Sequence, residues 1–182
     1  LGTIAVDQEA LKHIDEHLTK NGMQSIHRIQ QEQEHSLEIE LPFLQTVLAT
    51  PFELVPIMVR THQPDSLKTL AAIMADLVKE KPTLLVASTD LSHFNPAKKA
   101  EILDNAILQD IQNLDPEQLL KDNASGKGAA CGAGAVALTM FTAKALGANH
   151  ADILNYTHSG HITGDYSSVV GYGAVAIYQQ EG

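Results

Sequence analysis

The sequence predicts an α/β fold: a layered, mixed and mostly parallel sheet with helices on both faces. Segments with the pattern of strands alternate with segments with the pattern of helices along most of the 182 residues. Two strand-like segments, 151–157 and 167–178, end the chain with a hairpin-like loop at 159–165 between them, so we expect a mixed sheet. The length suits a single domain over residues 1–182.

The N-terminal segment predicts a short extended stretch and one helix. Residues 1–6 are mostly apolar and have an extended pattern. Asp7 is a typical N-cap, and the apolar stripe that follows it predicts a helix over residues 8–18. Asn21-Gly22 is a typical helix end.

The next elements are a helix, a strand and a second helix. Residues 34–48 place leucines on one helical face, and Pro42 within them predicts a kink or a break. Residues 53–59 are predicted to form a strand. Residues 65–77 are predicted to form a helix with one apolar face.

The second half continues the alternation. The apolar run 83–87 predicts a buried strand, and a helix is predicted over residues 97–113. Residues 115–117 combine a cap with a proline, a typical start of a short helix. A loop of small residues at 121–130 leads to a predicted helix of small and apolar residues over 131–146.

Composition disfavours several classes of protein. The chain is 44% hydrophobic and 19% charged, as ordinary globular proteins are, and its net charge of −10 disfavours nucleic-acid binding. No apolar run reaches the length of a membrane span, and the first residues lack a signal-peptide pattern. One cysteine excludes an internal disulfide framework, so we expect a cytoplasmic protein. The chain begins at Leu1 rather than Met, and we expect a processed, trimmed or partial chain.

Asp90 and His93 form the most informative pair. They lie three residues apart in Ser88–Phe94, the turn that leaves the C-terminal end of the predicted strand 83–87. Open α/β sheets place ligand sites at such strand ends. A histidine there can transfer a proton near neutral pH, and an aspartate can fix its tautomer. The alternative is a polar loop in which Asp90 caps a turn and His93 is solvated.

Two further features combine reactive chemistry with a structural alternative. Cys131 is placed at a predicted helix N-terminus, which favours a thiolate, although free cysteines are often small buried hydrophobes. Glu34 and His35 begin a predicted helix, where they either serve a site or cap the helix. Cys131 with His93 would also suit a cysteine-hydrolase dyad.

Other histidines and glycines give weaker signals. His13 and His17 have metal-ligand spacing, but their acidic neighbours favour a solvated helix face. Gly132-Ala133-Gly134 lacks the preceding strand and the third glycine of a dinucleotide-binding loop. His158 and His161 either line a pocket or are exposed.

Four motifs follow one another along essentially the whole chain. They are Glu34-His35-Ser36-Leu37-Glu38 with Leu41-Pro42, Ser88-Thr89-Asp90-Leu91-Ser92-His93, Cys131-Gly132, and Ser167-Ser168-Val169-Val170-Gly171-Tyr172. Together and in this order they resemble the Memo-like family, which includes protein B of the AmmeMemoRadiSam system. The resemblance implies a fold like that of the class III extradiol ring-cleavage dioxygenases, which hold non-haem Fe(II) with two histidines and a carboxylate.

The resemblance implies roles position by position. His93 matches the active-site histidine that acts as acid or base near the metal, and Asp90 matches the acid of the same motif. Cys131 matches the position at which Memo-like proteins have a cysteine in place of the dioxygenase carboxylate. Metal binding by Cys131 and His93 is therefore implied. Glu34 and His35 match a motif near the pocket.

The chain departs from the family at its N-terminus. Family members have about a hundred further residues before the point matched by Leu1-Gly2, within the size range of a domain. Those residues contain two motifs that supply the histidine ligands, so the chain resembles the C-terminal two-thirds of a Memo-like protein. We expect iron(II) or copper in the full-length protein and no bound cofactor in this chain alone, because stable sites need three or four ligands. Expected partners are radical-SAM proteins of the system, a peptide or protein ligand, or a second copy in a homo-oligomer, but neither nucleic acid nor a membrane.

Three functions compete at this stage. The first is a metal-dependent, dioxygenase-like oxidoreductase, or its remnant, with a redox or modification role. The second is a non-enzymatic module that reuses the cleft to bind a peptide or protein, and the third is a cysteine-nucleophile hydrolase. We expect Asp90, His93 and Cys131 to surround one cleft at the C-terminal edge of the sheet. We also expect the incomplete sheet to cause self-association or marginal stability.

Overall fold

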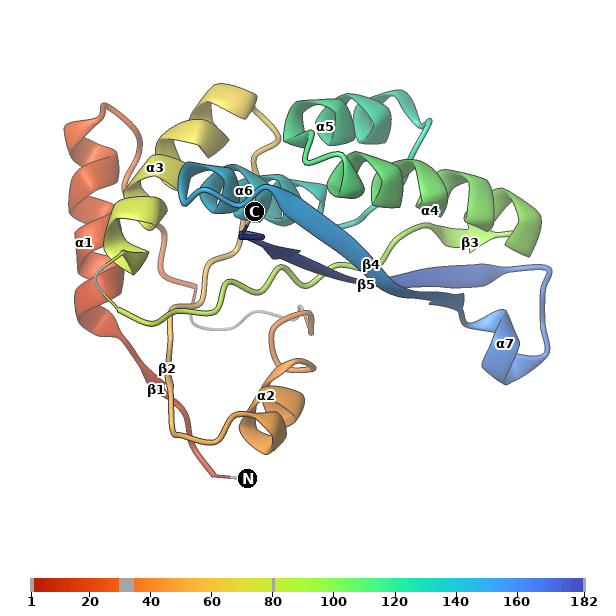
Figure 1. The fold of residues 1–182 in the computed structure, drawn as a ribbon, viewed down its shortest axis with the longest axis horizontal. Helices are drawn as coiled ribbons and strands as arrows, with labels where there is room; N and C mark the ends of the chain where they lie inside the picture. Colours follow the sequence, from red (N-terminus) through yellow and green to blue (C-terminus); the bar gives the residue numbers. More distant parts are fainter. Residues whose placement is uncertain (1, 30–34, 80, 182) are drawn as a thin grey trace.

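The structure is a computed structural model that describes residues 2–29, 35–79 and 81–181 (Figure 1). Two of the residues named above, Leu1 and Glu34, lie outside the described residues. The helices are α1 (Gln8–Lys20), α2 (Leu41–Val47), α3 (Pro64–Val78), α4 (Ala97–Gln112), α5 (Pro116–Ser125), α6 (Ala133–Ala145) and α7 (Gly160–Thr163), and the strands are β1 (Ala5–Val6), β2 (Glu53–Leu54), β3 (His93–Asn95), β4 (His150–His158) and β5 (Val169–Tyr178).

The α/β class is confirmed, but the strands do not form one mostly parallel sheet. Among the described residues, β1 and β2 make a short parallel pair, and β3, β5 and β4 make an antiparallel sheet in that order. The long ribbon of β4 and β5 is the hairpin expected from the end of the sequence, with α7 in its connection. Figure 1 shows α4, α5 and α6 together on one side of this ribbon. Leu154 and Tyr172 on the ribbon are exposed, so these helices cover one of its faces rather than both.

One predicted strand is shorter than expected, and another is absent. Only Glu53–Leu54 of the segment 53–59 is paired, and no residue of 83–87 belongs to a strand. An extended apolar segment becomes a strand only when a neighbour pairs with its N–H and C=O groups. The described residues supply no such neighbour for 83–87, and Leu84 is 64% exposed there.

Helix boundaries follow the capping chemistry. The carboxylate of Asp7 accepts the N–H of Ala10 at 2.8 Å and begins α1, as predicted. Of the predicted kink or break at Pro42, the structure shows a break: α2 begins only at Leu41 and places this proline in its first turn, so the helix is shorter than the predicted 34–48. A proline is tolerated there since the first N–H groups of a helix have no partner within it.

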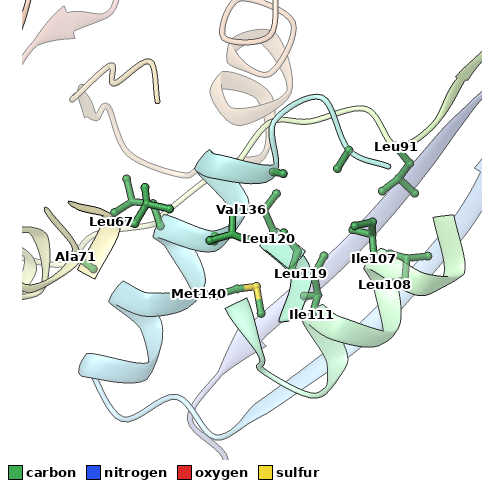
Figure 2. Close-up of a cluster of buried hydrophobic side chains, with 14 residues drawn as sticks. Leu67, Ala71, Leu91, Ile107, Leu108, Ile111, Leu119, Leu120, Val136 and Met140 are labelled. Carbon is green, nitrogen blue, oxygen red and sulfur yellow. The ribbon is translucent and has the colours of Figure 1, made fainter. Parts of the chain in front are cut away.

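The main core lies where the helices meet the ribbon (Figure 2). Figure 2 shows Leu91, from the turn after the extended segment 83–90, close to Ile107 and Leu108 of α4. Leu91 is 4% exposed, so it fastens this turn to the core. A second, smaller core joins α1 to α3 through Ile14, Leu18 and Ile73.

Candidate functional site

The structure brings Asp90 and Cys131 into direct contact through two hydrogen bonds, one between their main chains and one to the sulfur of Cys131. The N–H of Cys131 donates to the carbonyl oxygen of Asp90 at 3.1 Å, and the N–H of Asp90 donates to Cys131 Sγ at 3.3 Å. The turn after the extended segment and the start of α6 are thereby held together, although the segment before the turn is not the strand that was expected there. The thiol is exposed.

Asp90 also holds His93. Asp90 Oδ2 lies 3.3 Å from His93 Nε2, and the two side chains are 47% and 37% exposed. A carboxylate at this distance fixes the ring orientation and tautomer of an imidazole. Asp90 thus contacts both the thiol, through its N–H, and the imidazole, through its side chain. We call Asp90, His93 and Cys131 the thiol–imidazole cluster.

The close contact at Cys131 requires the glycine that follows it. A Cβ on Gly132 would lie 2.9 Å from both the carbonyl oxygen of Ser88 and Oγ1 of Thr89. Thr89 Oγ1 instead accepts the N–H of Gly132 at 2.8 Å and lies 3.5 Å from Cys131 Sγ. Thr89 therefore lines the cluster. It belongs to the sequence motif Ser88–His93, but its residue type alone did not indicate this role.

A second loop approaches the same helix start. A Cβ on Gly134 would lie 2.6 Å from the carbonyl oxygen of Thr61 and 3.5 Å from Cδ2 of His62. The sequence did not indicate His62, because its approach to the start of α6 joins two segments that are far apart in the chain. The glycines at 132 and 134 are thus explained by two loops packed on α6 and not by a dinucleotide, in agreement with the sequence interpretation.

A buried carboxylate lies behind the cluster. Asp104 of α4 is fully buried and accepts hydrogen bonds from the N–H of Ser92 and the hydroxyl of Tyr156. Burial and the carboxylate of Asp104 raise the pKa of Tyr156, so this hydroxyl stays protonated and donates. The signal in the sequence is an aspartate on the apolar face of a helix that also contains Ile107 and Leu108.

The residue after His93 is exposed and held in an unusual conformation. Phe94 has a φ of 56° and is 77% exposed, with its ring edge-on to His93 at a centroid distance of 5.6 Å. The left-handed region is unfavourable for a phenylalanine, and Phe94 adopts it at the irregularity between His93 and Asn95, the two residues of β3 that pair with β5. An exposed aromatic ring therefore stands beside the imidazole.

The other predicted site residues lie elsewhere or contribute indirectly. His35 Nδ1 is 2.6 Å from Glu38 Oε1, in the turns before α2, and its side chain is mostly exposed. From the same turns, Glu40 reaches the site segment, because Ser88 Oγ donates to Glu40 Oε1 at 3.1 Å. Its predicted neighbour Glu34 lies outside the described residues.

The remaining histidine pairs are on other elements. His158 is buried at the end of β4 and stacks on the exposed His161 at 4.0 Å. His13 and His17 also stack at 4.0 Å and face a groove of about 520 Å³ between α1 and α3, with Asp76 on the opposite side. Both pairs are separate from the thiol–imidazole cluster.

The available donors do not make a metal site by themselves. Across 2–29, 35–79 and 81–181, no three histidine, cysteine, aspartate or glutamate side chains are grouped so as to hold an ion. Cys131 and His93 provide two donors of the soft and borderline kind that iron and copper accept. His93 Nε2 is already directed at Asp90, so the described residues do not fit a three-ligand iron or copper centre.

Within the described part of the chain, none of the helices combines the length and the apolar character needed to cross a bilayer.

Comparison with known proteins places the chain in a family. The sequence profile of the Memo-like proteins matches residues 1–176. A MEMO1 family protein of Nitrosopumilus maritimus is 35% identical over 175 residues, which cover 96% of this chain and 62% of that protein. MEMO1 family proteins of Methanosarcina barkeri and Methanobrevibacter smithii are 36% and 37% identical, over 97% and 94% of this chain and 66% and 60% of theirs. The chain therefore spans less than two thirds of the length of some curated relatives. On this evidence the chain belongs to the Memo-like protein family.

Proposed function

We propose that the chain forms one wall of a dioxygenase-like cleft in a Memo-like protein with a redox or modification role, and that the thiol–imidazole cluster is its reactive part. The observation that supports this most is the double contact of Asp90, which joins the thiol of Cys131 at 3.3 Å and the imidazole of His93 at 3.3 Å. A thiol, an imidazole and a carboxylate meet there at exposed positions. A substrate at the surface can reach all three.

The cluster provides acid–base chemistry. The carboxylate of Asp90 lies 3.3 Å from His93 Nε2 and orients the ring, and an imidazole held in this way can accept a proton from a bound substrate and return it. The N–H of Asp90 donates to Cys131 Sγ, an interaction that strengthens when the sulfur is a thiolate. The same N–H therefore holds the sulfur in place for a role as a ligand or nucleophile.

A resident metal is a proposal about the full-length protein. Because the described donors do not fit an iron or copper centre, we derive no step through a metal. We propose that iron(II) or copper is held in the full-length protein, with Cys131 and His93 supplemented by ligands from the part of the relatives that this chain does not span. Interaction with radical-SAM proteins of the AmmeMemoRadiSam system and a cytoplasmic location rest on the family resemblance in the same way.

A second candidate function is a binding module for a peptide or protein. The exposed and conformationally constrained ring of Phe94 beside His93 favours it, because exposed aromatic side chains are typical anchors of protein contacts. A hydrolase based on Cys131 and His93 has less support. No hydrogen bond joins these two side chains in the described structure, and His93 Nε2 points to Asp90.

The decisive experiment uses the protein extended to the length of its relatives. Its metal content is measured by mass spectrometry after loading with iron(II) or copper, and oxygen uptake is followed with catechols as probes. Cys131→Ser is expected to lower metal occupancy at least about tenfold, as loss of a ligand or of its support does. His93→Gln is expected to abolish oxygen uptake.

The matched control is a second histidine–carboxylate pair. His150 Nε2 lies 3.2 Å from Asp152 Oδ1, at exposures close to those of the His93–Asp90 pair. His150→Gln is expected to change neither occupancy nor uptake. If the extended protein takes up neither metal nor oxygen but binds a peptide through Phe94, the binding module replaces the dioxygenase-like cleft as the proposed function.

A further inference from the structure

Asp104 is the most deeply buried charged residue that contacts the cluster's turn. The residue is 0% exposed and projects from the middle of α4. Its Oδ1 accepts the N–H of Ser92 at 2.7 Å, and its Oδ2 accepts the hydroxyl of Tyr156 at 2.8 Å. Ser92 is flanked by Leu91 and precedes His93 directly. The carboxylate therefore links the turn to α4 and to β4.

The same turn is also held by β5. The N–H of Leu91 donates to the carbonyl oxygen of Gly171, and the N–H of Gly171 donates to the carbonyl oxygen of Ser92, each at 2.9 Å. A Cβ on Gly171 would overlap Oδ2 of Asp104. The strand thus needs glycine at this position to let the carboxylate reach both of its donors.

Burying a carboxylate at position 104 is unfavourable for the stability of the fold. The other buried residues on this face of α4 include Ala100, Ile107, Leu108 and Ile111. An apolar residue in place of a buried charge often leaves a protein equally or more stable. Asp104 has the property that its apolar neighbours lack: two acceptor oxygens for two donors that approach from different elements.

We propose that Asp104 is a positioning residue, whose buried carboxylate sets the turn that directs Asp90 toward Cys131 and His93. This inference rests on the proposed function of the thiol–imidazole cluster. The carboxylate touches neither the thiol nor the imidazole, and it acts through the N–H of Ser92. Its loss frees Ser92 and Tyr156 together and lets the turn move away from the start of α6.

The test uses the 182-residue chain and reads the cluster without any turnover. Cys131 is the single cysteine, so iodoacetamide reports on it alone. Asp104→Ala is expected to slow alkylation at pH 7.5 by about two- to tenfold, the factor that loss of the hydrogen bond from Asp90 to Cys131 Sγ corresponds to. It is also expected to shift the ring resonances of His93 in NMR spectra and to leave those of His150 in place.

The conservative variant separates position from charge. In Asp104→Asn, the amide oxygen accepts from Ser92 and the amide nitrogen donates to the oxygen of Tyr156, so both contacts persist. Asp104→Asn is therefore expected to retain alkylation within about twofold of the unmodified chain and to leave the His93 signals in place. Should Asp104→Ala not fold, Tyr156→Phe takes its role, because it removes one of the two donors and shifts the His93 signals.

Asp122 provides the matched control. It is 4% exposed, lies on α5, and accepts from Gln118 and Lys127 rather than from the turn. Asp122→Asn is expected to lower stability without slowing alkylation. Equal slowing of alkylation in Asp104→Ala and Asp122→Asn would overturn the proposal, because it would indicate a general loosening of the fold. Unchanged alkylation and unchanged His93 signals in Asp104→Ala, or in Tyr156→Phe where that variant is used instead, would also overturn it. Since no readout needs metal or oxygen, failure here is distinct from failure of the proposed function.

Discussion

At the scale of single residues, the cluster depends on positions where a neighbouring backbone leaves no room for a side chain. Gly132 is pressed against Ser88 and Thr89, and Gly134 against Thr61. Both glycines flank the first residue of α6, directly after Cys131. The position of the thiol is therefore set by close packing of these glycines against the carbonyl groups of Ser88 and Thr61 and the side chain of Thr89.

Gly132→Ala is expected to weaken both stability and the geometry of Cys131. Its φ of −96° suits alanine, so the cost arises from the contacts at 2.9 Å alone. We expect a loss of about 1–3 kcal/mol in the free energy of unfolding, typical of overpacking, measured by urea denaturation.

Gly22→Ala is the control for this substitution, since Gly22 has open space around it and a φ of +75°. The Gly22→Ala variant introduces backbone strain without a steric clash. The alkylation rate of Cys131 in this variant is expected to equal that of the unmodified chain. Wild-type stability and alkylation in Gly132→Ala would show that the loops can move apart at no cost.

Asp110 gives the protein a pH-dependent stability. Burial, and then the negative charge of Asp122, raise the pKa of Asp110 to about 6, and Lys127 opposes part of this shift. The folded state then binds more protons than the unfolded chain between about pH 4 and pH 6, so stability from this group falls as pH rises through that window. Above about pH 7 the group adds no further change.

Asp110→Asn is expected to remove this dependence. The variant gains up to about 3 kcal/mol relative to the unmodified chain at pH 8 and little at pH 4, as a shift of two pKa units implies. Denaturation curves at pH 4, 6 and 8 measure the difference. Parallel pH profiles for the two proteins would show that Asp110 ionises normally.

At the scale of elements, the cluster sits on a segment that no strand pairs with along its length. In the described residues, 83–90 extends past β2 and α3 without ladder partners, and the segment is fastened at its end by Leu91. The side chain of Leu91 reaches the core near α4 and β5, where a Cβ on Gly173 would lie 3.3 Å from it.

Leu91→Ala is expected to cost about 2–5 kcal/mol, the range for a buried leucine. It is also expected to speed amide hydrogen exchange at Ser92 and His93, because the turn loses its anchor. Leu84→Ala, at a position 64% exposed, is the matched control and is expected to change stability by less than about 0.5 kcal/mol. Similar costs for the two substitutions would mean that Leu91 is not the anchor.

Elements with local signals, including the β4–β5 hairpin, were predictable, and strand pairing between segments far apart in the sequence was not. Helices α1 and α5 begin at Asp7 and Asp115, whose carboxylates accept the N–H groups expected of caps. The segment 83–87 has a strand's composition, but strand formation depends on neighbours that are far away in sequence or absent from the described residues. Composition alone therefore overestimated the parallel sheet.

The same division applies to the site. The meeting of Asp90, His93 and Cys131 was expected from a strand end and a helix N-terminus. The contacts are present, but 83–87 forms no strand, so the meeting does not arise in the way that was expected. Their functional roles stay predictions. Asp104 and His62 were missed, since each reaches the site region through contacts between elements distant in sequence.

At the scale of the whole molecule, several large apolar side chains are exposed. Phe43, Val47, Leu84 and Val86 are 68%, 73%, 64% and 46% exposed. They lie on α2 and on the unpaired extended segment, the parts of the chain that make few strand contacts. The relatives are longer by more than a third of their own length, so additional polypeptide is available in them to cover such surface.

The isolated chain is therefore expected to self-associate or to be marginally stable. Sedimentation velocity at micromolar concentration is expected to show species larger than the 19.6 kDa monomer, and Val86→Lys to reduce them. A monomer that unfolds cooperatively well above the ~45–65 °C of mesophilic domains would contradict this expectation.

The central claim is that Asp90, His93 and Cys131 form one site. The most direct measurement is an NMR comparison of the histidine rings before and after alkylation of Cys131 with iodoacetamide. The account predicts that the ring signals of His93 shift, because Asp90 contacts both the sulfur and the imidazole, while those of His150 stay in place. Unchanged His93 signals after complete alkylation would contradict it.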